Sequence, residues 1–216
     1  MLFDLDGTLV DSAPDLALAA NAQRERHGLE ALPAAAYRHL VGSGARGMVR
    51  VSFGKAPGDP GYEPLRQEFM ELYAERLLIH TRVFDEVAPV LDALDAQGQR
   101  WGIVTNKAHA LAQRVVQGLA LAHRCAVLIG GDSTPHTKPH PAPLLEAAAR
   151  TRVAAPLCVY VGDDSRDIQA GQAAGMTALA AAWGYLGDAG PIHTWQAHAV
   201  LERPHDLLQW VGSPHL

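Results

Sequence analysis

Hydrophobic residues follow a helical period in the first part of the chain. Between residues 14 and 81 they follow this period in two stretches, residues 16–23 and residues 62–77, as in amphipathic helices. Ser12 followed by Pro14 is typical of a helix start with Ser12 as N-cap, and Gly28 is typical of a helix end. Residues 54–61 hold three glycines and two prolines and show no period, which predicts a loop. Residues 14–81 are therefore predicted to form a small helical unit.

From Arg82 onward, short apolar runs alternate with stretches of helical period. The predicted strands, with the short run at the start of the chain, are residues 1–3, 103–104, 126–129, 158–161 and 177–182. Such alternation predicts a parallel sheet with helices on both faces. We therefore predict an α/β protein whose core, a three-layer Rossmann-like sheet, is formed by residues 1–13 and 82–216. Residues 14–81 are inserted into it as an α-helical cap domain.

The composition is that of a folded enzyme. The 216 residues are 48% hydrophobic and carry a net charge of −5, with acids and bases interspersed. There is no basic stripe for nucleic acid, and no run of the roughly 18 apolar residues that a spanning helix needs. Cys125 and Cys158 lack metal-ligand spacing, and residues 1–3 lack the basic start of a signal peptide. We therefore expect a cytoplasmic protein with no nucleic-acid or membrane partner.

The first polar cluster directly follows the first apolar run. Asp4 and Asp6 are two residues apart, and Gly7 lets the chain turn after them. Taken alone, they are equally typical of an Asp-Gly turn at a strand end. A carboxylate attacks phosphorus when a cation screens its charge, and a second carboxyl can protonate the departing oxygen. Asp4 and Asp6 are therefore candidates for the nucleophile and the acid/base of phosphoryl transfer.

Three later strand ends supply the other groups that such chemistry requires. Thr105 and Asn106 follow one predicted strand and offer neutral donors for phosphate oxygens. Lys138 offers a cation that neutralises both the nucleophile and the phosphate. Asp163 ends another predicted strand, and carboxylate oxygens are the ligands that Mg²⁺ prefers. These ends are expected at one edge of the parallel sheet, so the sequence predicts a phosphate site there.

Together and in this order, the four clusters resemble the motifs of the haloacid dehalogenase superfamily, on its phosphatase branch. The resemblance implies that Asp4 forms an aspartyl-phosphate. It implies that Asp6 protonates the leaving group and then activates water. Thr105, Asn106 and Lys138 would hold the phosphate of a small-molecule ester.

The same resemblance implies a magnesium site. Mg²⁺ would bind Asp4, the backbone carbonyl of Asp6, and Asp163. Asp164 and Asp167 would act indirectly, through water or hydrogen bonds. The apolar run before Asp4 is shorter than is usual in the superfamily, so we expect either a short central strand or a natural start further upstream.

Within the superfamily, nearly the whole chain resembles bacterial phosphoglycolate phosphatases and N-acetylmuramic acid 6-phosphate phosphatases. Residues 41–49 resemble the cap loop that reads the leaving group in both, so Arg46 is expected to contact the substrate. The Gly-Ala-Arg sequence of this loop favours the sugar-phosphate group, whereas phosphoglycolate is the commoner substrate of such chains. The resemblance also implies a monomer or a homodimer.

Two other enzyme functions share the expected fold, and a signalling module from a different class uses similar groups. A dehalogenase would not need Asp6. A phosphosugar mutase keeps both aspartates and returns the phosphate to its substrate, so only product analysis distinguishes it. A phosphoacceptor signalling module also uses acids, a threonine and a lysine on a parallel sheet, but it has no helical lid. The predicted unit at residues 14–81 therefore favours the hydrolase, and the mutase stays open.

Overall fold

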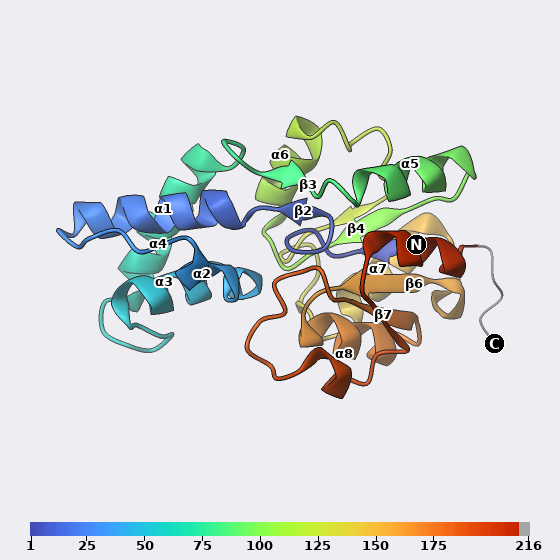
Figure 1. Ribbon diagram of the computed structural model, residues 1–216. Helices are drawn as coiled ribbons and strands as arrows, with labels where there is room; N and C mark the ends of the chain where they lie inside the picture. The colour runs from blue at the N-terminus through green and yellow to red at the C-terminus, as the bar shows by residue number, and fades with distance from the viewer. Residues whose placement is uncertain (212–216) are drawn as a thin grey trace.

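The computed structural model describes residues 1–211, in which a sheet with flanking helices lies beside a group of helices (Figure 1). Six parallel strands form the sheet in the order β5-β4-β1-β6-β7-β8. The strands are β1 (Leu2–Phe3), β4 (Gly102–Val104), β5 (Leu128–Ile129), β6 (Val159–Gly162), β7 (Thr177–Ala181) and β8 (Ala199–Leu201). The predicted parallel α/β sheet is confirmed, whereas its edge strand β8 was not predicted.

Helices cover both faces of this sheet. Successive strand residues point to opposite faces, so Phe3 and Ile103 pack into one core, and Leu2 and Val104 into another. The first face carries α5 (Ala88–Ala96), α6 (His109–Gly118) and the 3-10 helix η4 (Pro204–Trp210). The second face carries α7 (Ala142–Thr151) and α8 (Ser165–Ala173). Short 3-10 turns η2 (Ala155–Leu157) and η3 (Ile192–Thr194) precede β6 and β8. The predicted three layers are confirmed.

The second group of helices comes from the segment that follows β1. Its elements are α1 (Ala13–Arg26), α2 (Ala35–Arg38), the 3-10 turn η1 (Val41–Ser43), α3 (Gly44–Phe53) and α4 (Tyr62–Arg76). The predicted loop at residues 54–61 and the predicted helix end before Gly28 agree with the structure. The loop expected over residues 41–49 is wrong beyond Ser43. From Gly44 the chain is helical, because Met48 and Val49 are buried on the face of α3 that packs against α1 and α4.

The two connections between these parts lie side by side. Strand β2 (Val10–Asp11) precedes α1, strand β3 (Arg82–Val83) follows α4, and the two pair in antiparallel fashion. The buried carboxylate of Asp15 accepts hydrogen bonds from the backbone N–H groups of His80 and Thr81. The short β2–β3 ladder was not predicted. The division at residues 13–14 and 81–82 stays a prediction, and residues 212–216 of the predicted core lie outside the described residues.

Ser12 occupies the predicted N-cap position of α1, but its side chain does not cap the helix. Its hydroxyl donates to Asp6 Oδ1 over 2.5 Å. The backbone N–H groups of Ser12 and Ala13 instead donate to the phenol oxygen of Tyr185, at 2.8 and 3.0 Å. The start of α1 is therefore tied to the loop that follows β7.

Both cysteines are free thiols. Cys125 is half-buried and Cys158 is buried. Among residues 1–211, no helix combines the length and the apolar character needed to cross a bilayer.

Candidate active site

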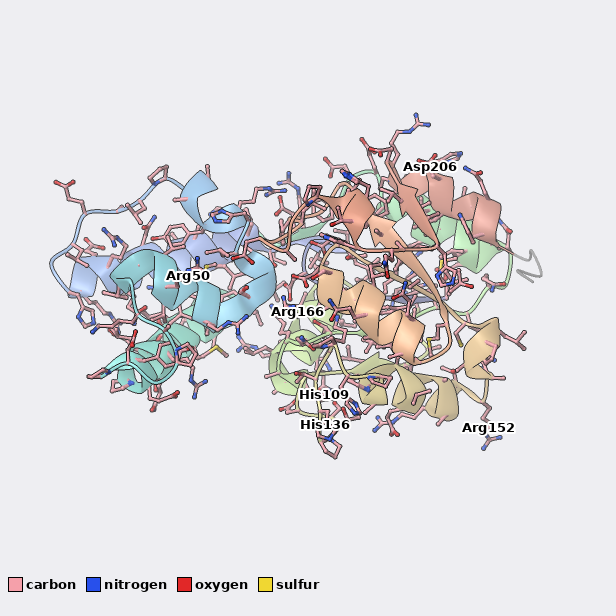
Figure 2. All side chains as sticks on the ribbon, turned by 90° about the horizontal axis from the view of Figure 1, so that it is seen from below. Arg50, His109, His136, Arg152, Arg166 and Asp206 are labelled. Carbon is pink, nitrogen blue, oxygen red and sulfur yellow. The ribbon has the colours of Figure 1, made fainter. Side chains whose placement is uncertain are left out.

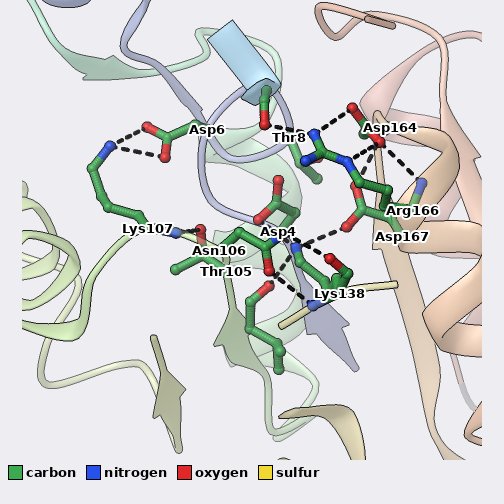
Figure 3. A network of polar contacts seen from close by, with 12 residues as sticks. Asp4, Asp6, Thr8, Thr105, Asn106, Lys107, Lys138, Asp164, Arg166 and Asp167 are labelled. Carbon is green, nitrogen blue, oxygen red and sulfur yellow. Dashed lines mark hydrogen bonds and ion pairs between the residues drawn. The ribbon is translucent and has the colours of Figure 1, made fainter. Parts of the chain in front are cut away.

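The polar ends of the central strands meet in one cavity. It has a volume of about 230 Å³ and lies between the ends of β1, β4 and β6 and the helices α1 and α4. The predicted site residues that line it are Asp4, Asp6, Thr105, Asn106, Lys138 and Asp163. Figure 3 labels all of these except Asp163 and shows their polar contacts together with residues that were not predicted. The fold therefore joins groups that the sequence places at separate strand ends.

Lys138 lies at the centre of the network. Its Nζ atom is 2.8 Å from Asp4 Oδ1 and 2.7 Å from Asp167 Oδ1. The same atom donates to the carbonyl of Val104 and to the phenol oxygen of Tyr160, at 3.0 and 2.7 Å. Burial lowers the pKa of Lys138, but Asp167 and Asp4 raise it more, so the pKa lies above its usual range. Lys138 is therefore a fixed positive charge beside Asp4.

Three carboxylates converge next to this lysine. Oxygens of Asp4, Asp163 and Asp167 lie within 4.8 Å of one another. Burial, together with the neighbouring carboxylates, raises the pKa of Asp163 well above its usual range. Burial also raises the pKa of Asp167 to about 6, although Lys138 opposes the rise. A compact set of oxygen donors whose charges repel one another fits a hard divalent cation such as Mg²⁺.

This carboxylate cluster differs from the predicted metal ligands at one position. Asp167 belongs to it, although an indirect role was expected. The Asp6 carboxylate does not belong to it, consistent with the expectation that Asp6 would contribute only its backbone carbonyl. Asp163 is held in place by Thr8 Oγ1 and the backbone N–H of Tyr185, each donating over 2.8 Å. The two oxygens of Asp163 are therefore oriented by donors on different loops.

Asp6 points away from Asp4 and is held by Lys107 (Figure 3). Lys107 Nζ lies 2.9 Å from each oxygen of the Asp6 carboxylate. It also lies 4.8 Å from the centre of the Tyr73 ring on α4. Burial lowers the pKa of Lys107, but Asp6 and Tyr73 raise it above its usual range. The sequence reasoning missed Lys107, although it directly follows Asn106 at a strand end.

Thr105 and Asn106 shape the floor of the cavity. The Asn106 side chain donates to the carbonyl of Lys138 and accepts from its backbone N–H, both over 3.0 Å. Thr105 is buried, and its Oγ1 accepts from the backbone N–H of Lys107 over 3.2 Å. Asn106 therefore orients the segment that carries Lys138. Its predicted contact with phosphate stays a prediction.

Similarity to known proteins shows which enzymes share this site. Residues 1–181 match the model of the haloacid dehalogenase-like hydrolases, a span that includes every residue labelled in Figure 3. The chain belongs to this hydrolase family. The predicted superfamily is therefore confirmed.

Similar proteins define the chemistry of the hydrolase more closely. A phosphoglycolate phosphatase of Xanthomonas campestris pv. campestris (strain 8004) is 48% identical over 215 residues, which cover 99% of this chain and 96% of that protein. An N-acetylmuramic acid 6-phosphate phosphatase of Pseudomonas aeruginosa PAO1 is 38% identical, with 96% and 92% covered. A crystal structure described as a predicted phosphoglycolate phosphatase from Haemophilus somnus 129PT has a TM-score of 0.84 at 29% identity, with 97% and 96% covered. The hydrolase is thus an enzyme that acts on phosphoric monoesters.

Arg46 and Arg166 of the hydrolase line different cavities. Arg46 is exposed on α3 and lines a separate cavity with Arg50 and Asp188, so the structure does not bring it to Asp4. Its contact with the substrate stays a prediction. Arg166 lines the cavity that holds Asp4, and the sequence reasoning assigned it no role. The sequence feature that could have identified Arg166 is its position within the acidic motif at residues 163–167.

Proposed function

We propose that the hydrolase removes phosphate from a small-metabolite monoester through an aspartyl-phosphate on Asp4. The first candidate substrate is 2-phosphoglycolate, and the second is N-acetylmuramic acid 6-phosphate. The single observation that supports the mechanism best is the geometry at Asp4, whose carboxylate meets Lys138 at 2.8 Å and faces two further carboxylates. The order of the candidates follows from the 48% and 38% identity to phosphatases named for these substrates.

In the proposed first step, an Asp4 carboxylate oxygen forms a bond to phosphorus while the ester P–O bond breaks. Lys138 orients the carboxylate and offsets the negative charge of the phosphoryl group. Asp6 gives its proton to the departing oxygen. In the second step, Asp6 takes a proton from a water molecule that attacks the phosphorus and releases phosphate from Asp4. Thr105 supplies a hydroxyl for the phosphate oxygens.

The metal requirement is part of the same proposal. Asp4, Asp163 and Asp167 would hold Mg²⁺, with the backbone carbonyl of Asp6 as a further ligand. When bound, the ion offsets the charge of the phosphate and of the carboxylates around it. Asp164 caps α8 by accepting the backbone N–H of Arg166 over 2.9 Å, which orients the turn that carries Asp163 and Asp167.

We further propose that residues 14–81 act as a cap that excludes water and selects the leaving group. The side chains that they contribute to the cavity are mostly apolar: Leu16, Val41, Ala45, Phe69 and Met70. The charged groups of the cavity all come from the sheet side. Such an apolar roof over a charged floor favours a small organic ester. A cytoplasmic location and a monomer or homodimer stay predictions.

The test of this function is phosphate release from a substrate panel, with Mg²⁺ and with EDTA. The panel contains 2-phosphoglycolate, N-acetylmuramic acid 6-phosphate, glucose 6-phosphate and β-glucose 1-phosphate. We expect the highest kcat/KM for 2-phosphoglycolate and no turnover in EDTA. Conversion of β-glucose 1-phosphate to glucose 6-phosphate without free phosphate would instead show a mutase. A folded protein that releases no phosphate from any ester would refute the proposal.

Asp6→Asn is expected to lower kcat by about 10²–10⁴-fold, because an amide cannot transfer the proton to the leaving oxygen. Substrate affinity should change far less, since the phosphate is held by other groups. Single-turnover kinetics and equilibrium binding measure the two effects separately. Equal losses in turnover and in binding would contradict the role of Asp6 as acid/base. The loss of kcat should be smaller for p-nitrophenyl phosphate, because its good leaving group needs less protonation to depart.

A further inference from the structure

We propose that Arg166 binds a carboxylate on the leaving group of the substrate, which makes the hydrolase selective for acidic phosphate esters. This inference rests on the proposed phosphatase function. Both candidate substrates carry one carboxylate in addition to the phosphate. Figure 2 shows Arg166 on α8, at the junction between the sheet and the helices of residues 14–81. It also lines the cavity that contains Asp4.

The hydrogen bonds of Arg166 leave part of its guanidinium group unused. A guanidinium has five N–H donors. The Nε atom donates to Asp164 Oδ1 over 2.8 Å, and Nη2 donates to Asp164 Oδ2 over 2.8 Å and to the carbonyl of Gly42 over 2.6 Å. Within residues 1–211, Nη1 has no partner for its two N–H groups. A charged group with two free donors at the wall of a cavity is suited to an anionic oxygen.

The other two cations of the cavity already bind acceptors within the protein. Lys138 donates to Asp4 and two further oxygens. Lys107 places two hydrogen bonds on Asp6 and lies over the ring of Tyr73. Among the described residues that line the cavity, the helical unit contributes no charged side chain. Among the cations of this cavity, Arg166 is therefore the one whose N–H donors are not all used within the described residues.

The surroundings of Arg166 hold it rigidly. Asp164 binds the Nε–Nη2 edge in a two-point contact, so the guanidinium plane is fixed. Gly42 comes close because it has no side chain: a Cβ atom there would lie 3.1 Å from Asp164 Oδ2. The guanidinium thus joins the sheet side to η1 of the helical unit. A carboxylate on Nη1 would be bound where the two parts of the protein meet.

The experiment compares two esters that differ only in this carboxylate: 2-phosphoglycolate and its neutral amide, carbamoylmethyl phosphate. The quantity measured is the ratio of their kcat/KM values. We expect wild type to prefer the acid and Arg166→Gln to lower the ratio by about 10- to 100-fold, as for loss of a charge-assisted hydrogen bond. Arg166→Lys keeps the charge and should retain part of the preference. Arg150→Gln is the matched control, because Arg150 is exposed on α7 and pairs with Glu146.

The ratio separates recognition of the carboxylate from a structural role. If Arg166 only holds Gly42 and Asp164, its replacement slows both esters in proportion and the ratio stays at the wild-type value, which would overturn the inference. A wild-type enzyme without preference for the acid would overturn it as well. If the enzyme releases phosphate from both esters, the proposed phosphatase function stands whichever ratio is found. If Arg166→Gln does not fold, the inference is tested by the ratio of kcat/KM values for Arg166→Lys and for wild type.

Discussion

Asp4→Asn is expected to lower kcat for phosphate release by about 10⁴-fold or more, the scale seen when a catalytic nucleophile is removed. The amide is a poor nucleophile, whereas the Asp4 carboxylate is held ready by Lys138 at 2.8 Å. The variant should fold, because losing one of three crowded carboxylates relieves repulsion with Asp163 and Asp167. Its melting temperature in EDTA should therefore equal or exceed that of wild type.

The measurement has two parts. The first is kcat for the best ester of the panel, with Asp92→Asn as the control, because Asp92 lies exposed on α5 and pairs with Arg124. The second is acid quenching during turnover with radiolabelled ester, which should trap a phosphoryl group on wild type and not on Asp4→Asn. If the variant keeps more than a few per cent of wild-type turnover, the nucleophile is another group.

Lys138→Met is expected to damage both catalysis and stability. The activity should fall by about 10³-fold or more, because the charge that offsets the phosphoryl oxygens is lost. In EDTA, the free energy of unfolding should fall by about 3–5 kcal/mol, the cost of leaving buried charges without their partner. The variant leaves Asp4 and Asp167 without their shared cation in a buried site. Denaturant unfolding with and without EDTA measures this loss.

Addition of Mg²⁺ should restore part of the stability of Lys138→Met, because the ion places positive charge among the same carboxylates. It should not restore the activity. Lys55→Met is the control, since Lys55 is the one lysine of the chain outside the cavity. A Lys138→Met variant as stable as wild type in EDTA would show that Asp4 and Asp167 do not need their shared cation for folding, and would contradict this prediction.

The layers of the fold were predictable because their signals are local. Helices such as α6 and α7 repeat their apolar positions within one segment, and strands such as β6 and β7 are short continuous apolar runs. The pairing of β2 with β3 was missed because each of these two-residue strands contains a charged residue, Asp11 or Arg82, and so forms no apolar run. The edge strand β8 was also missed. Helix α3 was taken in part for a loop because residues 41–49 resemble the cap loop of similar proteins, whereas burial of Met48 and Val49 against other helices decides its conformation.

For the site, the sequence by itself determined the chemistry of the strand ends. Asp4, Thr105, Lys138 and Asp163 were predicted to meet because parallel strands bring their carboxyl ends to one edge, and all four line one cavity. Only the tertiary structure decided which side chains touch. Lys107 pairs with Asp6 across 101 positions of the chain, and no local pattern encodes such a contact.

Arg46 and Arg166 also show that contacts between distant residues are not readable from the sequence. Arg46 was singled out for its loop, but the turn of α3 exposes it on another surface. Arg166 lies within a motif that was recognised for its acids, and its contact with Gly42 spans 124 positions. Where a long side chain points depends on the packing of elements that are distant in sequence. The sequence therefore determined the family, the layers and the groups at the strand ends, and the tertiary structure decided how the charged side chains of the cavity pair.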